Sequence, residues 1–300
     1  MGLLNMAGTS ASDEGVATGG VSPIWFVVVA VLLWSTGGLF IKSSTLSAAE
    51  LSGARALFAA ATVMLLTRQE GFRLNLVTAV AAVFYAALLY LFVRATMMTT
   101  AANAIFLQYT APVYILLAEP FFFKEKYRAG DFVVVAFCIV GMSLFFVGQL
   151  RPQDVEGNFL ALGSGACFAV FFLLLRHPRT REVNRASSVI YGNLLLALVM
   201  LPAIIQGAEH FTTTNILIAA YLGIVQLGVA YTLLTLGIAR GVKSLDAGII
   251  GYIEPVLNPV WVFLFIGERP AKWALLGGAI IIAAVASHTI WAARKAVRRQ

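Results

Sequence analysis

One acidic residue, Glu254, lies in the middle of a long apolar run and is the first candidate for chemistry in this sequence. A charge at the centre of a bilayer costs at least about 2.5–3.5 kcal/mol on insertion scales. The carboxyl group must therefore be protonated, pair with a cation or face a wet cavity. We expect Glu254 to bind a substrate amine or a proton. The alternative is a structural carboxylate that caps backbone groups freed by Pro255 and Pro259.

One basic residue, Arg55, lies inside another apolar run. Together with Glu254 it would hold an amino-acid zwitterion, because a guanidinium binds a carboxylate and a carboxylate binds an amine. The alternatives are a structural ion pair, for which Glu254 is the natural partner, and a side chain that extends to the membrane interface. The residue types favour the structural alternatives.

Three prolines, Pro112, Pro255 and Pro259, interrupt apolar runs. Proline removes a backbone hydrogen bond and kinks a helix, and broken backbone is tolerated in lipid only where protein or a cavity covers it. The sequence therefore predicts helices that bend around a central cavity, with the three prolines as hinges. The alternative is a static kink without motion.

Polar and aromatic side chains lie close to these prolines in the sequence. Polar groups that face lipid are unfavourable, so the amides of Gln108 and Asn258 are expected to face protein or water and to orient a substrate. The aromatic residues have a competing explanation, because Trp and Tyr also form belts at membrane interfaces. The predicted substrate-binding residues are Glu254, Gln108, Asn258, Tyr109, Tyr252, Trp34, Tyr85, Tyr231 and Arg55. The small residues Gly37-Gly38 and Gly163 with Gly165 are expected to permit close helix contacts.

Composition shows which elements must position these residues. The 300 residues are 60% hydrophobic and only 12% charged, whereas soluble domains carry roughly 25% charged residues. Most of the surface must therefore be solvated by lipid. Helices that cross a bilayer need about 20 apolar residues. Such runs lie at 24–42, 48–67, 76–95, 101–122, 130–149, 157–176, 186–206, 215–238, 245–266 and 271–293.

The basic residues lie in the short gaps between these runs and at the C-terminus, and the net charge is +7. This placement fits an anionic membrane surface, and no RRM, KH or zinc pattern supports nucleic-acid binding. With the N-terminus on one side of the membrane, that side receives fifteen Lys and Arg residues and the other side five. The positive-inside rule therefore predicts a bacterial or archaeal plasma-membrane protein with both termini in the cytoplasm.

An internal repeat divides the chain. Segment 104–126 aligns with 247–269, so that Tyr109 falls on Tyr252 and Pro112 on Pro255. The offset spans five apolar runs, so the second copy must be inverted, as in transporters whose site lies between two halves. The predicted units are a disordered cytoplasmic tail over 1–22, a five-helix repeat over 23–149, a linker over 150–156, an inverted five-helix repeat over 157–293 and a basic tail over 294–300.

Several motifs occur in a characteristic order. The first run contains Trp34-Ser35-Thr36-Gly37 and ends with Lys42, the second contains Arg55, and Glu254-Pro255 precedes Gly267-Glu268. A weaker copy is Ala111-Pro112 with Lys124-Glu125. Together these motifs resemble the EamA branch of the drug/metabolite transporter superfamily.

The resemblance covers nearly the whole chain from about residue 24. It implies an all-α integral membrane fold of ten helices in two inverted repeats, and transport of small organic metabolites, often export. Similar proteins include the YddG-type aromatic amino-acid exporters, which have a central cavity. The region around Pro112 departs from the YddG pattern.

The sequence has no P-loop, GxSxG motif or metal-ligand spacing. We therefore expect no catalytic residue, metal or cofactor, and transport by a monomer or weak homodimer driven by a substrate or proton gradient. Glu125 and Glu268 are expected to be gate or loop contacts. The predicted function is secondary transport, with export of amino acids including aromatic ones favoured. The alternatives are another amphipathic metabolite or a drug cation as substrate, a membrane enzyme, a channel, a lipid scramblase and a scaffold.

Overall fold

The computed structural model describes residues 22–123, 129–147, 152–175, 177–184, 186–240, 242 and 250–297. Within these ranges the chain contains helices, turns and connecting segments and no strand. Residues 1–21 of the predicted N-terminal tail, and Glu125 in a connection, lie outside the described residues.

The helices follow the apolar runs along the chain. They are α1 (Ile24–Ser35), α2 (Gly37–Ser43), α3 (Ala48–Leu66), α4 (Leu76–Met98), α5 (Ala101–Gln108), α6 (Ala111–Phe123), α7 (Ala129–Leu144), α8 (Pro152–Leu175), α9 (Ser187–Gln206), α10 (Thr213–Ala220), the π-helix η4 (Tyr221–Val229), α11 (Ala230–Ala239), α13 (Ile253–Ile266) and α14 (Lys272–Val297). Short 3-10 helices are η1 (Arg68–Glu70), η2 (Pro178–Glu182) and η3 (Ala208–His210).

Within the part of the chain that the structure describes, six helical segments are long and apolar enough to cross a membrane. They are Ile24–Ser43, Ala48–Leu66, Leu76–Met98, Pro152–Leu175, Ser187–Gln206 and Thr213–Ile238. The remaining predicted runs fall on α5 with α6, which are separate helices, and on shorter apolar stretches of α7, α13 and α14. The protein is a multi-pass membrane protein.

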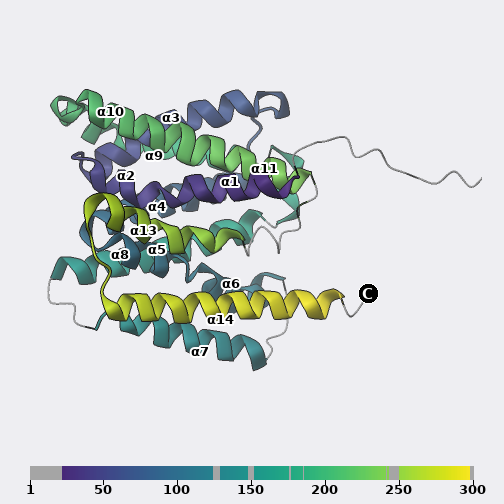
Figure 1. The fold of residues 1–300 in the computed structure, drawn as a ribbon. Coiled ribbons are helices and arrows are strands. Elements are labelled where there is room, and N and C mark those ends of the chain that lie inside the picture. Colours follow the sequence, from purple (N-terminus) through teal and green to yellow (C-terminus); the bar gives the residue numbers. More distant parts are fainter. Residues whose placement is uncertain are drawn as a thin grey trace, which may run out of the picture.

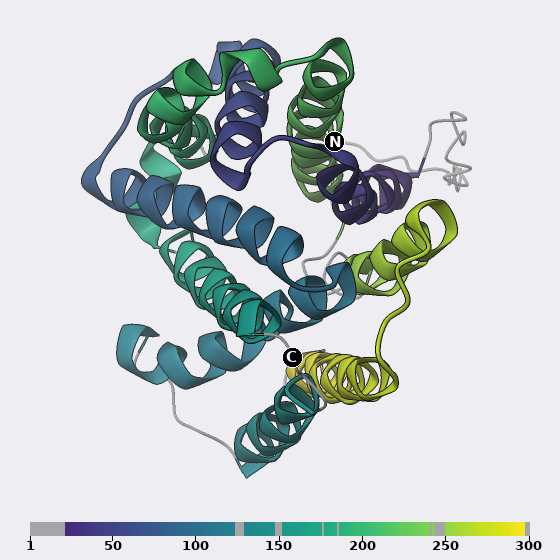
Figure 2. The same cartoon turned by 90° about the vertical axis from the view of Figure 1, so that its left-hand side faces the viewer.

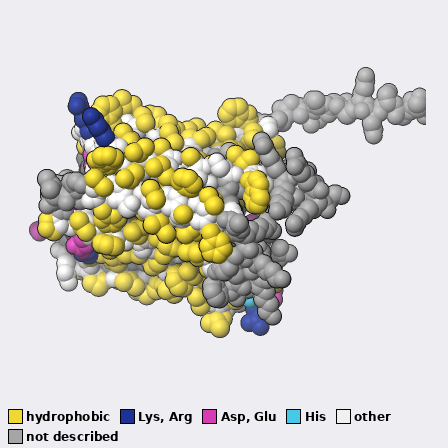
Figure 3. Space-filling model, turned by 90° about the horizontal axis from the view of Figure 1, so that it is seen from below, with side chains coloured by type: hydrophobic (Ala, Val, Ile, Leu, Met, Phe, Trp, Pro, Cys, Tyr) yellow, Lys and Arg dark blue, Asp and Glu magenta, His cyan; other side chains and the backbone are white. Residues whose placement is uncertain are grey.

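The outer surface has the polarity that a lipid solvent requires. On the face in Figure 3, hydrophobic side chains cover the region between the two ends, and charged side chains gather near the ends. Large hydrophobic side chains, which are usually buried in water-soluble proteins, are exposed here: Leu76 is 75% exposed, Phe265 70% and Leu198 67%. Such exposure would be unfavourable in water but not in hydrocarbon.

The helices lie side by side, and the main packing partners are distant in sequence (Figures 1 and 2). Helix α4 packs against α8 and α9, α3 against α9 and η4, α1 against α11, and α7 against α14. Helix α1 begins and α14 ends at the same end of the bundle (Figure 1). Two hydrophobic clusters form the core, one around Ile105 and Phe145 and the other around Tyr85 and Phe171.

Irregular backbone interrupts several helices deep in the bundle. A turn at Thr36 separates α1 from α2, Tyr109 and Thr110 separate α5 from α6, and a turn at Tyr252 precedes α13. The nine residues of η4 form a π-helix between α10 and α11, a distortion common at functional sites.

The predicted kinks at Pro112 and Pro255 differ from the observed backbone. Both prolines lie in the first turn of a new helix, α6 and α13, rather than within a continuous one. Proline is tolerated there because the first turn needs no backbone donor. Pro259 does lie inside α13.

Two predicted boundaries also differ. Helix α8 begins at Pro152, inside the predicted linker 150–156, and α14 continues to Val297, inside the predicted basic tail 294–300. Proline at the first position and Asp154 in the first turn both favour a helix start.

A polar cluster connects the start of α3 with η3. Ser47 caps α3, since its hydroxyl accepts from the Glu50 N–H and the Glu50 carboxylate accepts from the Ser47 N–H at 2.6 Å. The other carboxylate oxygen lies 2.8 Å from Nδ1 of His210. This hydrogen bond to Glu50, aided by its charge, raises the pKa of His210 above the ordinary 6.5.

We predict that His210→Gln removes a stabilisation that depends on pH. Because the folded pKa of His210 is raised, its contribution is complete below the unfolded pKa and is lost as pH rises through the folded pKa. The thermal midpoint of the wild type in detergent should exceed that of the variant at mildly acidic pH, and the difference should shrink at alkaline pH. In a Glu50→Gln background the His210 substitution should have no pH-dependent effect. A constant difference across the titration would contradict this assignment.

Candidate functional site

Glu254 lies in the first turn of α13, directly after the turn at Tyr252. Its Oε2 lies 2.7 Å from the hydroxyl of Tyr109, and the same hydroxyl lies 3.0 Å from the Gly251 carbonyl oxygen. The rings of Tyr109 and Tyr252 are 6.3 Å apart. Glu254 and both tyrosines remain partly exposed. The carboxylate therefore has a hydrogen-bonding partner within the protein, and whether it also faces a wet cavity stays a prediction.

The broken helices determine the electrostatics of this cluster. Helix α13 begins at Ile253, one residue before Glu254, and α6 begins at Ala111, two residues after Tyr109. Helix N-termini carry unpaired N–H groups and a partial positive charge. They offset part of the desolvation cost of Glu254 and offer donors to an anionic group of a solute.

A second polar group surrounds the break between α1 and α2. The Thr36 hydroxyl lies 3.0 Å from that of Tyr221, and Trp261 donates through Nε1 to the Ser35 hydroxyl at 3.0 Å. Gly37 and Gly38 allow the side chains of Gln226 and Asn258 to approach the α2 backbone, as a Cβ atom at either glycine would collide with them. The close contact predicted for this glycine pair is confirmed.

Two amides beside this break keep unused hydrogen-bonding capacity. Among the described residues, neither side-chain polar atom of Asn258 has a hydrogen-bond partner, and neither does Oε1 of Gln226. Asn258 is only 1% exposed and Gln226 6%. Buried polar atoms without a partner are uncommon in proteins. Asn258 lies one helical turn from Glu254 on α13, and its role in orienting a substrate stays a prediction.

Gln108 has a different role from the one predicted. Its Nε2 donates to the Ser164 hydroxyl at 2.7 Å, which in turn donates to the Leu88 carbonyl at 2.9 Å. The amide therefore connects α5 to α8 and α4. Sequence reasoning missed Ser164, although its position between Gly163 and Gly165 marks a site of close helix contact.

Arg55 and Glu254 do not form the pair that the sequence suggested. Arg55 is 1% exposed, so it does not extend to the interface, and its Nη2 donates to the Leu89 carbonyl at 3.1 Å. Its Nε has no hydrogen-bond partner among the described residues.

The predicted aromatic residues divide between two regions. Tyr109 and Tyr252 pack on the hydrophobic cluster around Ile105, whereas Tyr85 and Tyr231 belong to the cluster of α3, α4 and α9 near Arg55. Trp34 is partly buried at the end of α1, and its carbonyl lies 3.5 Å from Nε2 of Gln226. Trp34, Tyr109 and Tyr252 therefore lie beside the broken helices, and Tyr85 and Tyr231 do not.

An ion pair closes the end of the bundle opposite to the start of α1. Lys42 Nζ lies 2.8 Å from Oε2 of Glu268 and donates to the Thr99 carbonyl at 2.7 Å. Glu268 also accepts from the Ala101 N–H at 2.8 Å. These contacts connect α2, the α4–α5 connection and the segment after α13. Glu268 is thus a contact between connecting segments, and a gating role stays a prediction.

The described residues contain no group of three or more His, Cys, Asp or Glu side chains that could hold a metal ion. Broken helices inside an apolar bundle, with a carboxylate at one break, are characteristic of membrane transporters. The EamA-like transporter family matches residues 21–147 and again 155–289. The chain belongs to this family, within the drug/metabolite transporter superfamily, and is a transporter rather than an enzyme.

Curated relatives agree with this assignment. The threonine/homoserine exporter RhtA of Escherichia coli (strain K12) is 28% identical over 280 residues, which cover 88% of this chain and 92% of RhtA. The uncharacterized transporter YwfM of Bacillus subtilis is 25% identical and covers 83% and 88% of the two chains. The solute carrier family 35 member G1 of Mus musculus is 23% identical and covers 86% and 75%.

A solved crystal structure shares the fold. It aligns with a TM-score of 0.63 at 19% identity and covers 91% of this chain and 98% of the other. The narrower resemblance to YddG-type exporters stays a prediction.

We predict that Gly165→Ala destabilises the protein and that Gly163→Ala does not. A Cβ at Gly165 would lie 2.8 Å from the Gln108 carbonyl oxygen, where backbone cannot move aside, whereas at Gly163 the nearest atom is 3.6 Å away. Overpacking of this kind costs about 1–3 kcal/mol, and alanine is otherwise favoured over glycine in a helix. Thermal midpoints in detergent test this pair. Equal thermal midpoints for the two variants would show that the close contact between Gly165 of α8 and the Gln108 carbonyl does not contribute to stability.

Proposed function

We propose that this protein is a secondary transporter that exports amino acids across a bacterial plasma membrane. Transport would proceed by alternating access between two inverted five-helix halves. The observation that carries this proposal is the carboxylate of Glu254 inside the apolar bundle, which accepts a hydrogen bond from Tyr109 beside two interruptions of helices.

The proposal of inverted halves is supported by the positions of the breaks. The break at Tyr109 and the turn at Tyr252 fall on the same position of the internal alignment, three residues before the aligned prolines Pro112 and Pro255. The family also matches the chain twice, once in each half.

Packing supports the same symmetry. If the first half is α1 to α7 and the second α8 to α14, the pair α4–α8 corresponds to the pair α11–α1, and α3–η4 corresponds to α9–α4. The pairs α3–α9 and α7–α14 each correspond to themselves. A pseudo-twofold axis in the membrane plane produces this set of pairs.

The site chemistry fits an amino-acid zwitterion. Glu254 would bind the ammonium group, and the amide of Asn258, which has no hydrogen-bond partner among the described residues, would bind the carboxylate. Trp34 and Tyr252 would form walls, which keeps aromatic amino acids among the candidates. The name of the RhtA relative, a threonine/homoserine exporter, supports amino acids as the substrate class.

Arg55 would not take part in this site, because it bonds to a backbone carbonyl in another cluster. With both termini in the cytoplasm, the end closed by Lys42 and Glu268 would be the outer one. The structure would then be an outward-closed state, in which a substrate enters from the cytoplasm.

We predict that Glu254→Gln lowers amino-acid counterflow in proteoliposomes by about 10- to 150-fold, because a hydrogen bond to a charged group is worth about 1.5–3 kcal/mol. Residual transport should lose its dependence on pH, since the amide cannot carry a proton. Threonine, homoserine and phenylalanine would serve as the first radiolabelled substrates.

Glu209→Gln is the matched control, because the Glu209 side chain is 84% exposed on a connection. It should transport at the wild-type rate. A thermal midpoint close to that of the wild type would show that Glu254→Gln is folded. Wild-type counterflow with unchanged pH dependence in Glu254→Gln would refute the proposed role of this carboxylate.

We predict that the Lys42–Glu268 pair restricts access from its end of the bundle. In a protein with Cys138 and Cys167 replaced by alanine, Thr36→Cys should react faster with a membrane-impermeant maleimide when Lys42→Ala is added. The double variant Lys42→Glu, Glu268→Lys should restore slow labelling only in part. The Thr99 carbonyl accepts a hydrogen bond from Lys42 and the Ala101 N–H donates one to Glu268, so both favour the native placement of the two charges. Equal labelling rates in all three proteins would show that the pair is not a gate.

A further inference from the structure

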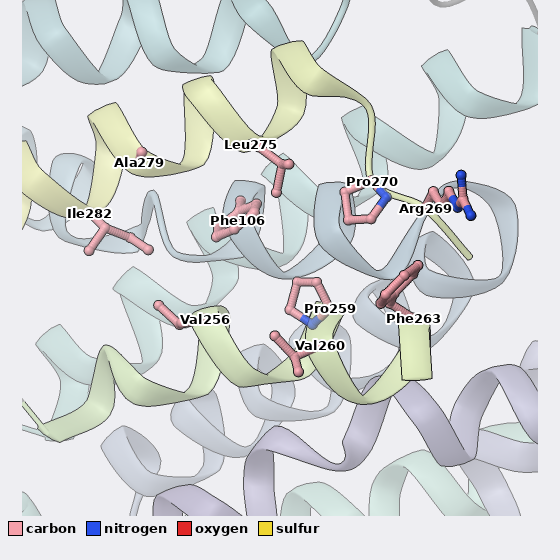
Figure 4. A pocket seen from close by; sticks show the side chains of 10 residues that line it. All are labelled: Phe106, Val256, Pro259, Val260, Phe263, Arg269, Pro270, Leu275, Ala279 and Ile282. Atoms are coloured by element: carbon pink, nitrogen blue, oxygen red, sulfur yellow. The ribbon is translucent and has the colours of Figure 1, made fainter. Parts of the chain in front are cut away.

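An apolar groove of about 460 Å³ runs between α13 and α14 (Figure 4). Its walls are hydrophobic side chains of α13, including Val256, Val260 and Phe263, and of α14, including Leu275 and Ile282. Phe106 of α5 and Pro259 also line the groove, while Arg269 and Pro270 lie at one end (Figure 4).

The groove opens toward the lipid rather than toward the proposed substrate site. Val256 is 51% exposed, Val260 41% and Leu275 48%. On α13, Glu254 and Asn258 contact α5 and α2, whereas Val256 and Val260 lie on another face of the helix. Arg269 is the only charged residue among those that line the groove. A solute with an ammonium group would find no carboxylate there.

Arg269 at the mouth of the groove keeps its charge available. Its guanidinium carbon lies 6.0 Å from the centre of the Phe263 ring, and no described carboxylate lies within ion-pair distance of it. The neighbouring Glu268 is already paired with Lys42. Gly267, with φ of 78°, ends α13.

We propose that this groove binds an anionic phospholipid, with an acyl chain between α13 and α14 and the phosphate on Arg269. A guanidinium matches the geometry of a phosphate and is weakly hydrated, so it suits this place at the membrane interface. The exposed side chain of Trp273, a residue type enriched at interfaces, lies four residues further on. Water would not fill an apolar groove that faces hydrocarbon, whereas an acyl chain restores its van der Waals contacts.

The site would favour a lipid with a net negative charge. Lys272 is exposed three residues after Arg269 but does not line the groove, and basic residues near a membrane surface attract anionic lipids. A zwitterionic lipid of the same chain length shares the phosphate but gains less from this potential. The inference does not depend on the transported substrate.

Native mass spectrometry of the purified full-length protein tests the proposal, with dioleoyl phosphatidylglycerol and dioleoyl phosphatidylcholine as probes. Arg269→Gln should lower the retention of phosphatidylglycerol relative to phosphatidylcholine by about fivefold, which corresponds to about 1 kcal/mol. Lys272→Gln, which removes a neighbouring charge that does not line the groove, should have a smaller effect. Ala279→Phe, which narrows the groove, should lower the retention of both lipids.

Glycerol phosphate carries the phosphate of the headgroup but no acyl chain, so it tests whether the headgroup alone binds. It should not compete with phosphatidylglycerol at equal concentration. Unchanged retention in Arg269→Gln would overturn the proposal. So would equal losses in Arg269→Gln and Lys272→Gln, which would indicate a diffuse surface charge. Full lipid retention in Ala279→Phe would place the lipid elsewhere. Thermal midpoints of the three variants would show that each is folded.

Discussion

A helix that breaks inside hydrocarbon exposes backbone carbonyls that must find donors within the protein, and this constraint governs the centre of the bundle. At two breaks a hydroxyl of the break itself folds back. Thr36 donates to the Leu33 carbonyl at 2.7 Å and Thr110 to the Leu107 carbonyl at 2.6 Å. At the third, Tyr109 reaches across to the Gly251 carbonyl. Short polar residues thereby make irregular backbone tolerable where a solute site needs it.

The charged side chains inside the bundle are likewise held by neutral hydrogen-bonding partners. Glu254 is stabilised by a tyrosine hydroxyl and the start of α13, and Arg55 by a backbone carbonyl. Only Lys42 and Glu268 form a close ion pair among these residues, and they lie at the end of the bundle. An arrangement with neutral partners leaves the carboxylate at the centre able to exchange its partner for a substrate cation. A tight internal salt bridge would oppose that exchange.

Close backbone contact positions these groups. Gly165 brings α8 against the Gln108 carbonyl, and Gly38 brings Asn258 against α2. Gly163, two residues from Gly165, makes no such approach. Small residues therefore predict that two helices approach one another. Which glycine of a pair makes the contact depends on the rotation of each helix about its axis, and amino-acid composition does not give that rotation.

Sequence alone determined the apolar helices and the family resemblance, and it singled out Glu254 as a carboxylate within an apolar run, because hydrophobic run length and the cost of a buried charge are local properties. The prolines indicated irregular backbone near Tyr109 and Tyr252, although the breaks precede them. Only the tertiary structure decided partners: Tyr109 rather than Arg55 for Glu254, and Ser164 for Gln108. It also decided the π-helix at Tyr221–Val229 and the groove between α13 and α14. These depend on contacts between helices far apart in the chain, and residue spacing within one helix carries no information about the rotation of its neighbour.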